Sequence, residues 1–96
     1  MIRHVVFFKF KAEASADEID NALAQLRDLP NKIEVIRDFE VGKDVLRAPR
    51  SWDAVIVATY DDLAALEQYT NHPAHTAVVE TLRPLTEAVG SVDFEA

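Results

Sequence analysis

Hydrophobic and polar residues alternate along the first eleven residues with the two-residue period of a β-strand. Both faces of this segment carry large apolar side chains near its middle, which predicts a central strand covered on two sides. One face holds Ile2, His4, Val6, Phe8 and Phe10, and the other holds Arg3, Val5, Phe7, Lys9 and Lys11.

The next segment has the period of an amphipathic helix. It opens with Ser15 and Glu18, whose spacing is that of a capping box, and it stops at Pro30. Polar residues fill the outer face, so we expect this helix to lie on a sheet. Its apolar stripe consists of Ile19, Ala22, Leu23, Leu26 and Leu29.

Three further strands are predicted. Residues 33–41 form a mixed polar and apolar strand of the kind found at a sheet edge, ended by Gly42. Residues 52–60 are apolar on both faces, because Ala54, Ile56 and Ala58 alternate with Val55 and Val57. Residues 91–95 form a last strand after Gly90. The loop at 43–51 carries Lys43, Arg47 and Arg50, which either meet an anionic ligand or are simply solvated.

The second helical region is interrupted at His72-Pro73. Asp61 and Asp62 signal a helix start, and Leu63, Leu66 and Thr70 form its expected inner stripe, with Tyr69 at the edge of that stripe. A residue before proline avoids the helical conformation, and proline suits the first position of a helix. We therefore expect one helix to end near Asn71 and another to run from Pro73 to about Arg83.

These elements follow the order β-α-β-β-α-β within a single domain of residues 1–96. The order predicts an α+β, ferredoxin-like fold with a four-stranded antiparallel sheet and helices on one face. The other face would expose Val5, Phe7, Val55 and Val57 to water. The simplest cover is a second copy, so we expect a homodimer through the sheet face; the alternative is a monomer with an apolar sheet surface.

Composition excludes several classes of partner and site. The net charge of −7 argues against nucleic acid and anionic membrane surfaces as partners. The chain has no cysteine, which removes disulfides, thiolate catalysis and cysteine-based zinc sites. No apolar run is long enough to span a bilayer and no signal peptide is apparent, so a cytoplasmic location is expected.

The chemistry of the chain centres on residues 69–75, which hold Tyr69, His72 and His75. His75 falls in the first turn of the second helix, on the side of Val78, Val79 and Leu82. A neutral imidazole facing inward either acts as a base or is a core histidine with one hydrogen bond. His72 precedes the helix, so a capping or surface role is expected for it.

The sequence resembles the stress-responsive dimeric α/β-barrel (Dabb) domain family over essentially its whole length. The resemblance is carried by the opening Ile-Arg-His-Val-Val-Phe-Phe-Lys-Phe-Lys, by residues 39–44, by the motif Tyr69…His72-Pro-Ala-His75 and by Val92-Asp-Phe94. It implies a ferredoxin-like protomer and a homodimer whose sheets close into a barrel. Most of the family has no assigned reaction, but one plant polyketide cyclase performs a C2–C7 aldol condensation without metal or cofactor.

Carried over residue by residue, the resemblance implies catalytic roles for three positions. His75 would be the base, Tyr69 the donor to the carbonyl oxygen, and Asp93 the acid that orients His75. A further pocket histidine of the cyclase matches His4, whereas another falls at Ala54, and its larger aromatic pocket residues are replaced by smaller ones along the first helix. We expect a substrate pocket for a small apolar carbonyl or aromatic compound, lined by His4, Val6, Phe8, Leu23, Val78 and Val79.

Other functions stay open at this stage. One is a non-catalytic protein of the stress response that works by association or ligand binding. Another is a cofactor-independent monooxygenase, a reaction found on related dimeric barrels. No cofactor and no catalytic metal are expected, because His72 lies outside the helix and its ring is splayed from that of His75. Some relatives hold a structural magnesium ion after the first helix.

Overall fold

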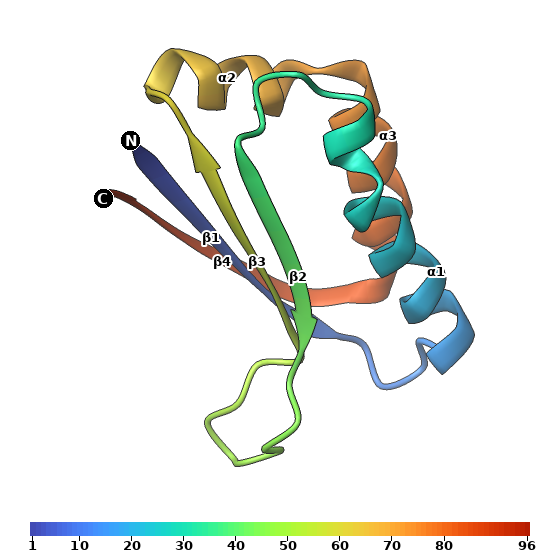
Figure 1. Ribbon diagram of the computed structural model, residues 1–96. Helices are drawn as coiled ribbons and strands as arrows, with labels where there is room; N and C mark the ends of the chain where they lie inside the picture. Colours follow the sequence, from blue (N-terminus) through green and yellow to red (C-terminus); the bar gives the residue numbers. More distant parts are fainter.

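The chain folds as a four-stranded antiparallel sheet with its helices on one face (Figure 1). A computed structural model describes residues 1–96. The strands are β1 (Ile2–Phe10), β2 (Asp38–Lys43), β3 (Ala54–Tyr60) and β4 (Thr86–Glu95), and they lie in the order β2-β3-β1-β4. The two strands with apolar residues on both faces are therefore central, as the sequence predicts, and the predicted α+β ferredoxin-like arrangement is confirmed.

Three α-helices connect the strands: α1 (Ala16–Arg27), α2 (Leu63–Asn71) and α3 (Pro73–Leu82). The capping box is present, because Ser15 Oγ accepts from Glu18 N and Glu18 Oε1 accepts from Ser15 N. Asp62 caps α2 by accepting from Ala65 N. Short 3₁₀ turns follow α1 and α3, at Leu29–Asn31 and Arg83–Leu85, and each contains the proline that ends the preceding helix.

Four strand boundaries differ by two residues or more from the sequence prediction. β3 begins at Ala54 and not at residue 52, and β2 continues to Lys43, so Gly42 lies inside it. β2 begins at Asp38 and not at residue 33, because Ile33 N bonds to Leu29 O and the Ile33 side chain is buried in the core. β4 begins at Thr86, and Gly90 lies inside it. Gly90 pairs with Phe7, and the Trp52 ring lies beside it, because a Cβ at Gly90 would be 3.7 Å from that ring, an ordinary van der Waals contact.

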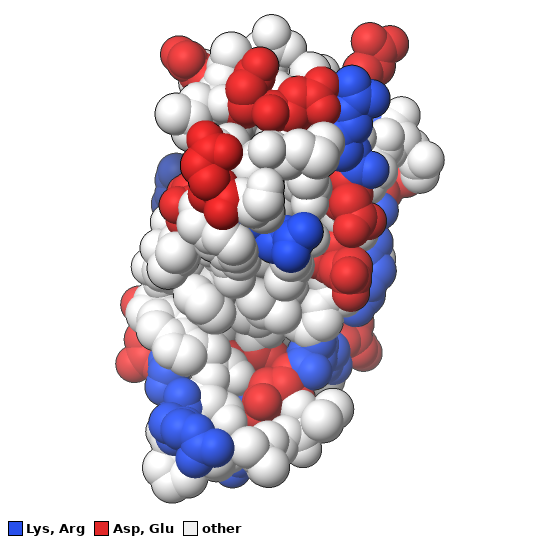
Figure 2. Space-filling view, turned by 60° about the vertical axis from the view of Figure 1, so that its left-hand side comes forward, with Lys and Arg blue, Asp and Glu red and all other residues white.

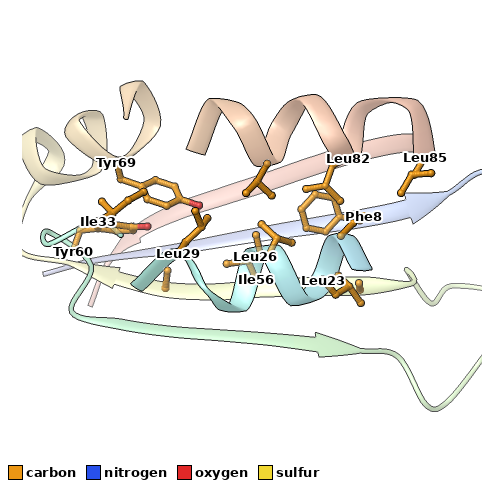
Figure 3. Packing of buried hydrophobic residues seen from close by; sticks show 14 residues of the cluster. Phe8, Leu23, Leu26, Leu29, Ile33, Ile56, Tyr60, Tyr69, Leu82 and Leu85 are labelled. Carbon is orange, nitrogen blue, oxygen red and sulfur yellow. The ribbon is translucent and has the colours of Figure 1, made fainter. Parts of the chain in front are cut away.

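The core lies between the sheet and the helices (Figure 3). It joins Phe8 and Ile56 from the central strands to Leu23 and Leu26 from α1 and to Leu82 from α3. Tyr60 and Tyr69 occupy one end of this layer, where their phenol groups meet it from β3 and α2. The helices thus bury one side of the sheet and bring α3 over β1.

The opposite face of the sheet has no helix on it. Cross-strand register places Val5 beside Val57 and Val92, and Phe7 beside Val55. Val92 is 55% exposed and Phe94 45%. Figure 2 brings this side of the molecule forward and shows a broad region of uncharged atoms across its middle, interrupted by a basic side chain, with most charged groups around it.

One local prediction is corrected: Leu63, expected on the inner stripe of α2, is 65% exposed, and Tyr69 is the buried residue of that helix. In the basic loop, Arg47 pairs with Asp44 and Asp53, and Lys43 pairs with Asp20, whereas Arg50 is exposed and forms no ion pair. None of the helices has the length and apolar character needed to cross a membrane.

Candidate functional site

A break between two helices places Tyr69 and His75 next to each other. α2 ends at Asn71, His72 is extended with φ −69° and ψ 137°, and α3 starts at Pro73. The ring of His72 caps the new helix, since its Nδ1 accepts from Ala74 N at 3.0 Å. This capping role matches the expectation for His72. As a result, the Tyr69 and His75 rings lie with their centroids 4.6 Å apart.

The same break fixes the orientation of the His75 ring. The last carbonyls of a helix have no partner within it, and the Thr70 carbonyl of α2 lies 2.9 Å from His75 Nδ1. A carbonyl oxygen only accepts, so Nδ1 carries the hydrogen. In neutral His75 the other nitrogen, Nε2, therefore holds a free electron pair, and no protein group bonds to it.

Burial controls the protonation of both rings. It lowers the pKa of His75 below the ordinary value of 6.5; the Thr70 carbonyl opposes this, and charge on nearby His4 adds to the lowering. Burial also raises the pKa of Tyr69 to about 12. Near neutral pH the site therefore holds an unprotonated imidazole beside a protonated phenol, which is the arrangement of a base and a hydrogen-bond donor.

His4 and Asp93 form a second pair on the floor of the site. They are direct cross-strand partners in the β1–β4 ladder, and His4 Nδ1 bonds to Asp93 Oδ1. The His4 ring lies edge-on to Tyr69, with centroids 6.0 Å apart. No third histidine, aspartate or glutamate joins them in a group that could hold a metal ion.

This pairing differs from the role that the family resemblance implies for Asp93. The structure orients His75 through the Thr70 carbonyl, whereas Asp93 contacts His4. The reason is register: strand alternation puts Asp93 opposite His4 on the helix-facing side of the sheet. Asp93 thus reaches the base only through the neighbouring imidazole.

A cavity of about 320 Å³ lies between α3 and the β1–β4 side of the sheet. Its volume is at the lower end of the range for small-molecule sites. Polar groups come from His4, Tyr69, Thr70 and His75 near the helix break and also from Arg83, Thr86 and Ser91, and Arg83 is the one Lys, Arg, Asp or Glu side chain on the wall. The remaining lining residues are Val6, Phe8, Leu26, Ile56, Val78, Val79, Leu82 and Val89.

Seven of the residues expected from the sequence therefore line one space: His4, Val6, Phe8, Tyr69, His75, Val78 and Val79. Leu23 does not line it. Its side chain is fully buried among core residues, and Leu26, one turn further along α1, reaches the cavity instead.

Sequence reasoning missed two groups at the site. The Thr70 carbonyl belongs to the backbone, and the helix break was the only signal for it. Tyr60 continues the alternation of Ala54, Ile56 and Ala58, which puts it on the face of His4; its ring centroid lies 5.1 Å from that of Tyr69. Its burial raises the pKa of the Tyr60 phenol above the ordinary range.

Known proteins resemble this chain over its full length. The sequence model of the family described as "Stress responsive A/B Barrel Domain" matches residues 2–96. An uncharacterised protein of Streptomyces coelicolor is 35% identical over 85 residues, which cover 86% of this chain and 88% of that protein. Olivetolic acid cyclase of Cannabis sativa is 23% identical over 95 residues, covering 97% of this chain and 94% of the cyclase.

Solved structures share the fold. A dimeric protein of unknown function with a ferredoxin-like fold, from Bacteroides fragilis, superposes with a TM-score of 0.88 at 28% identity. The match covers 99% of this chain and 95% of that one. That neighbour is described as dimeric, which bears on the uncovered face of the sheet.

Proposed function

The chain belongs to the stress responsive A/B barrel domain family. We propose that it is a cofactor-free catalyst acting on a small, mainly apolar carbonyl compound. His75 is the base and Tyr69 the hydrogen-bond donor. The observation that carries the proposal is that His75 and Tyr69 line one mainly apolar cavity with their rings adjacent, while the bond from His75 Nδ1 to the Thr70 carbonyl leaves Nε2 without a protein partner.

The first step is proton transfer from carbon. His75 Nε2 removes a proton from the carbon next to a carbonyl group, and the C–H electron pair forms a C=C bond as the carbonyl π pair moves onto oxygen. The Tyr69 O–H donates to that oxygen as its negative charge develops. A donor aimed at a developing oxyanion contributes about 10²–10³ in rate, and a positioned base about 10²–10⁴.

The second step uses the enolate within the same molecule. Its carbon attacks another carbonyl group, a carbon–carbon bond forms, and the new alkoxide takes the proton back from His75 Nε2. No oxidant or reductant is consumed, so side chains alone balance the reaction. This is the chemistry that the name of the Cannabis sativa relative, olivetolic acid cyclase, suggests for a protein of this family.

The cavity indicates the class of compound. Nine of its fifteen lining residues are hydrophobic; Tyr69 and His75 supply polar groups next to each other, and Arg83, Thr86 and Ser91 are polar residues elsewhere on the wall. A ligand with a carbonyl group at one end and an aliphatic or aromatic body fits this distribution. The family resemblance implies smaller pocket residues along the first helix than in the cyclase, so we expect a different substrate.

We also propose that the working form is a homodimer. The uncovered face, with Val5, Phe7, Val57, Val92 and Phe94, is too apolar to remain in contact with water in a stable monomer. A second copy covers it by twofold symmetry, in line with the dimeric Bacteroides fragilis neighbour. This face also favours a second candidate function, a non-catalytic dimer that acts by association and makes no use of the His75 Nε2.

Deuterium exchange separates the two candidates. The protein is mixed in D₂O with a panel of apolar methyl ketones and 1,3-diketones, and loss of the α-proton signal is followed by proton NMR. We expect catalysed exchange by the native protein, its loss in His75→Ala, and a decrease of 10²-fold or more in Tyr69→Phe.

The matched control is His72→Asn, which removes a neighbouring imidazole but keeps a capping side chain. It should exchange like the native protein. Absence of exchange across the whole panel, or equal exchange by His75→Ala, would contradict the catalytic proposal and favour association.

A further inference from the structure

The Tyr60 hydroxyl is a buried polar group without a partner. The side chain is fully buried, and Tyr60 Oη is the one buried side-chain nitrogen or oxygen with no hydrogen bond. Proteins rarely leave such a group unpaired, because burying it removes its bonds to water without replacing them. An unpaired hydroxyl at this position therefore calls for a functional explanation.

Tyr60 packs against the ring of the proposed donor, Tyr69, on the side away from the cavity lining. Its ring centroid is 5.1 Å from that of Tyr69, and the two rings are inclined by 47°. Figure 3 shows both phenols at the same end of the core, with their oxygens directed the same way. Tyr69 lines the cavity whereas Tyr60 does not, so Tyr60 reaches a ligand only through Tyr69.

Other neighbours offer Tyr60 no bond. The His4 ring lies 6.1 Å away and edge-on, and its Nδ1 is already bonded to Asp93. Burial has the larger effect on the pKa of Tyr69 and raises it, whereas hydrogen bonding by Tyr60 acts to lower it, although no hydrogen bond between the two phenols is fully formed. When the Tyr69 O–H donates a hydrogen bond to a ligand, the Tyr69 oxygen can therefore accept one from the Tyr60 O–H.

We propose that Tyr60 is a positioning residue that donates its O–H to Tyr69 Oη when Tyr69 donates to a negatively charged oxygen in the cavity. The inference rests on the proposed function and names its ligand class: an oxyanion, either an enolate or a phenolate. A chain of two hydrogen bonds strengthens each member, because donation by Tyr60 makes the Tyr69 hydroxyl a better donor. Burial keeps Tyr60 protonated and thus available to donate.

The first test measures the phenol pair (Tyr60 and Tyr69) without any substrate. These are the only tyrosines in the chain, so incorporation of fluorinated tyrosine, whose phenol is more acidic, gives two fluorine NMR signals. In Tyr60→Phe only the signal of Tyr69 remains. We expect the ionisation midpoint of Tyr69 to move to higher pH than in the native protein, because a donor to the tyrosinate has been removed. An unchanged or lower midpoint overturns the inference.

The second test measures oxyanion binding. The probes are 4-nitrophenolate and the neutral compound 4-nitrotoluene, which has a similar shape. The native protein should favour the phenolate, Tyr69→Phe should lose that preference, and Tyr60→Phe should weaken phenolate binding about five- to tenfold while 4-nitrotoluene binds as before.

The outcomes separate the inference from the proposed function. Equal weakening of both probes in Tyr60→Phe marks a merely structural tyrosine and overturns the inference, as does native-like binding of both. Failure of the native protein to favour the phenolate contradicts the proposed donor. A raised Tyr69 midpoint would then still support the hydrogen bond between the phenols.

Discussion

His75 Nδ1 lies 2.9 Å from the carbonyl oxygen of Thr70. The last turn of α2 therefore bonds to the imidazole of a residue in the first turn of α3. The bond is set by the backbone and fixes the tautomer of the imidazole. It leaves Nε2 without a protein partner, on a ring that lines the cavity next to the Tyr69 ring.

The loss of activity at low pH should follow the protonation of the His75 imidazole. Because burial lowers the pKa of its imidazole, the base stays unprotonated to a lower pH than a solvent-exposed histidine. We expect the ratio kcat/KM for α-proton exchange to fall on acidification with a midpoint below 6.5. His75→Ala should remove this transition together with the activity. A midpoint above 6.5 would show that the ring is not buried as described.

Asp93→Asn should have less effect than His75→Ala. The substitution weakens the bond to His4 but leaves the Thr70 carbonyl in place. We expect nitrogen NMR to show the hydrogen of neutral His75 on Nδ1 in both the native protein and the variant. A change of tautomer in Asp93→Asn would restore the role for Asp93 that the family resemblance implies.

Tyr60→Phe should not destabilise the protein. The hydroxyl removed is buried and unpaired, and its loss relieves a desolvation cost of about 1–3 kcal/mol while the ring keeps its packing. We expect an unchanged or higher free energy of unfolding in urea. Tyr60→Leu is the comparison, since it alters the packing and should destabilise. A clear loss of stability in Tyr60→Phe would reveal a partner for the hydroxyl.

Val92→Lys should dissociate the dimer without unfolding the protomer. It places a charge on the uncovered sheet face, on the edge strand β4, where Val92 is half exposed in one chain and pairs with Val5 of the central strand β1. Sedimentation velocity should show a monomer and circular dichroism a native spectrum. Leu63→Lys, at an exposed leucine on α2, is the control and should remain dimeric. A native protein that sediments as a monomer would refute the proposed assembly.

Leu23→Ala should lower the free energy of unfolding and leave the affinity for a ligand unchanged. Leu23 is fully buried in the core and does not line the cavity, so truncation should cost about 2–5 kcal/mol of unfolding free energy. Leu26→Ala, at a residue that lines the cavity, should also change the affinity for 4-nitrotoluene. Equal changes in affinity for the two variants would place Leu23 at the ligand after all.

The sequence predicted the elements better than their ends. Alternation found β1 and β3 as central strands, and the His72-Pro73 pair located the helix break to the residue. It misplaced the starts of β2, β3 and β4 and the end of β2. Ile33 reads as a strand residue but follows a turn and is buried in the core, and Gly90 reads as a turn but pairs with Phe7 inside β4. Core burial and strand pairing depend on segments distant in the sequence, which local periodicity does not encode.

The candidate site was also predicted only in part from the sequence. Shared helix and strand faces were enough to gather His75, Val78 and Val79, and His4 with its strand neighbours. The partner of His75 was not predictable, because it is a main-chain oxygen. Nor was the pairing of Asp93 with His4, which depends on the register between the first and last strands.

The joint at His72-Pro73 has a consequence for how such a protein diversifies. The reacting pair is spaced by the few residues of the joint, and adding one residue there would turn the imidazole by about 100° around the axis of α3. Exchanges at Val78, Val79 and Leu82 reshape the wall of the cavity and leave that spacing intact. Point substitutions can therefore alter which molecule is accepted, whereas insertions or deletions between positions 69 and 75 end the chemistry itself.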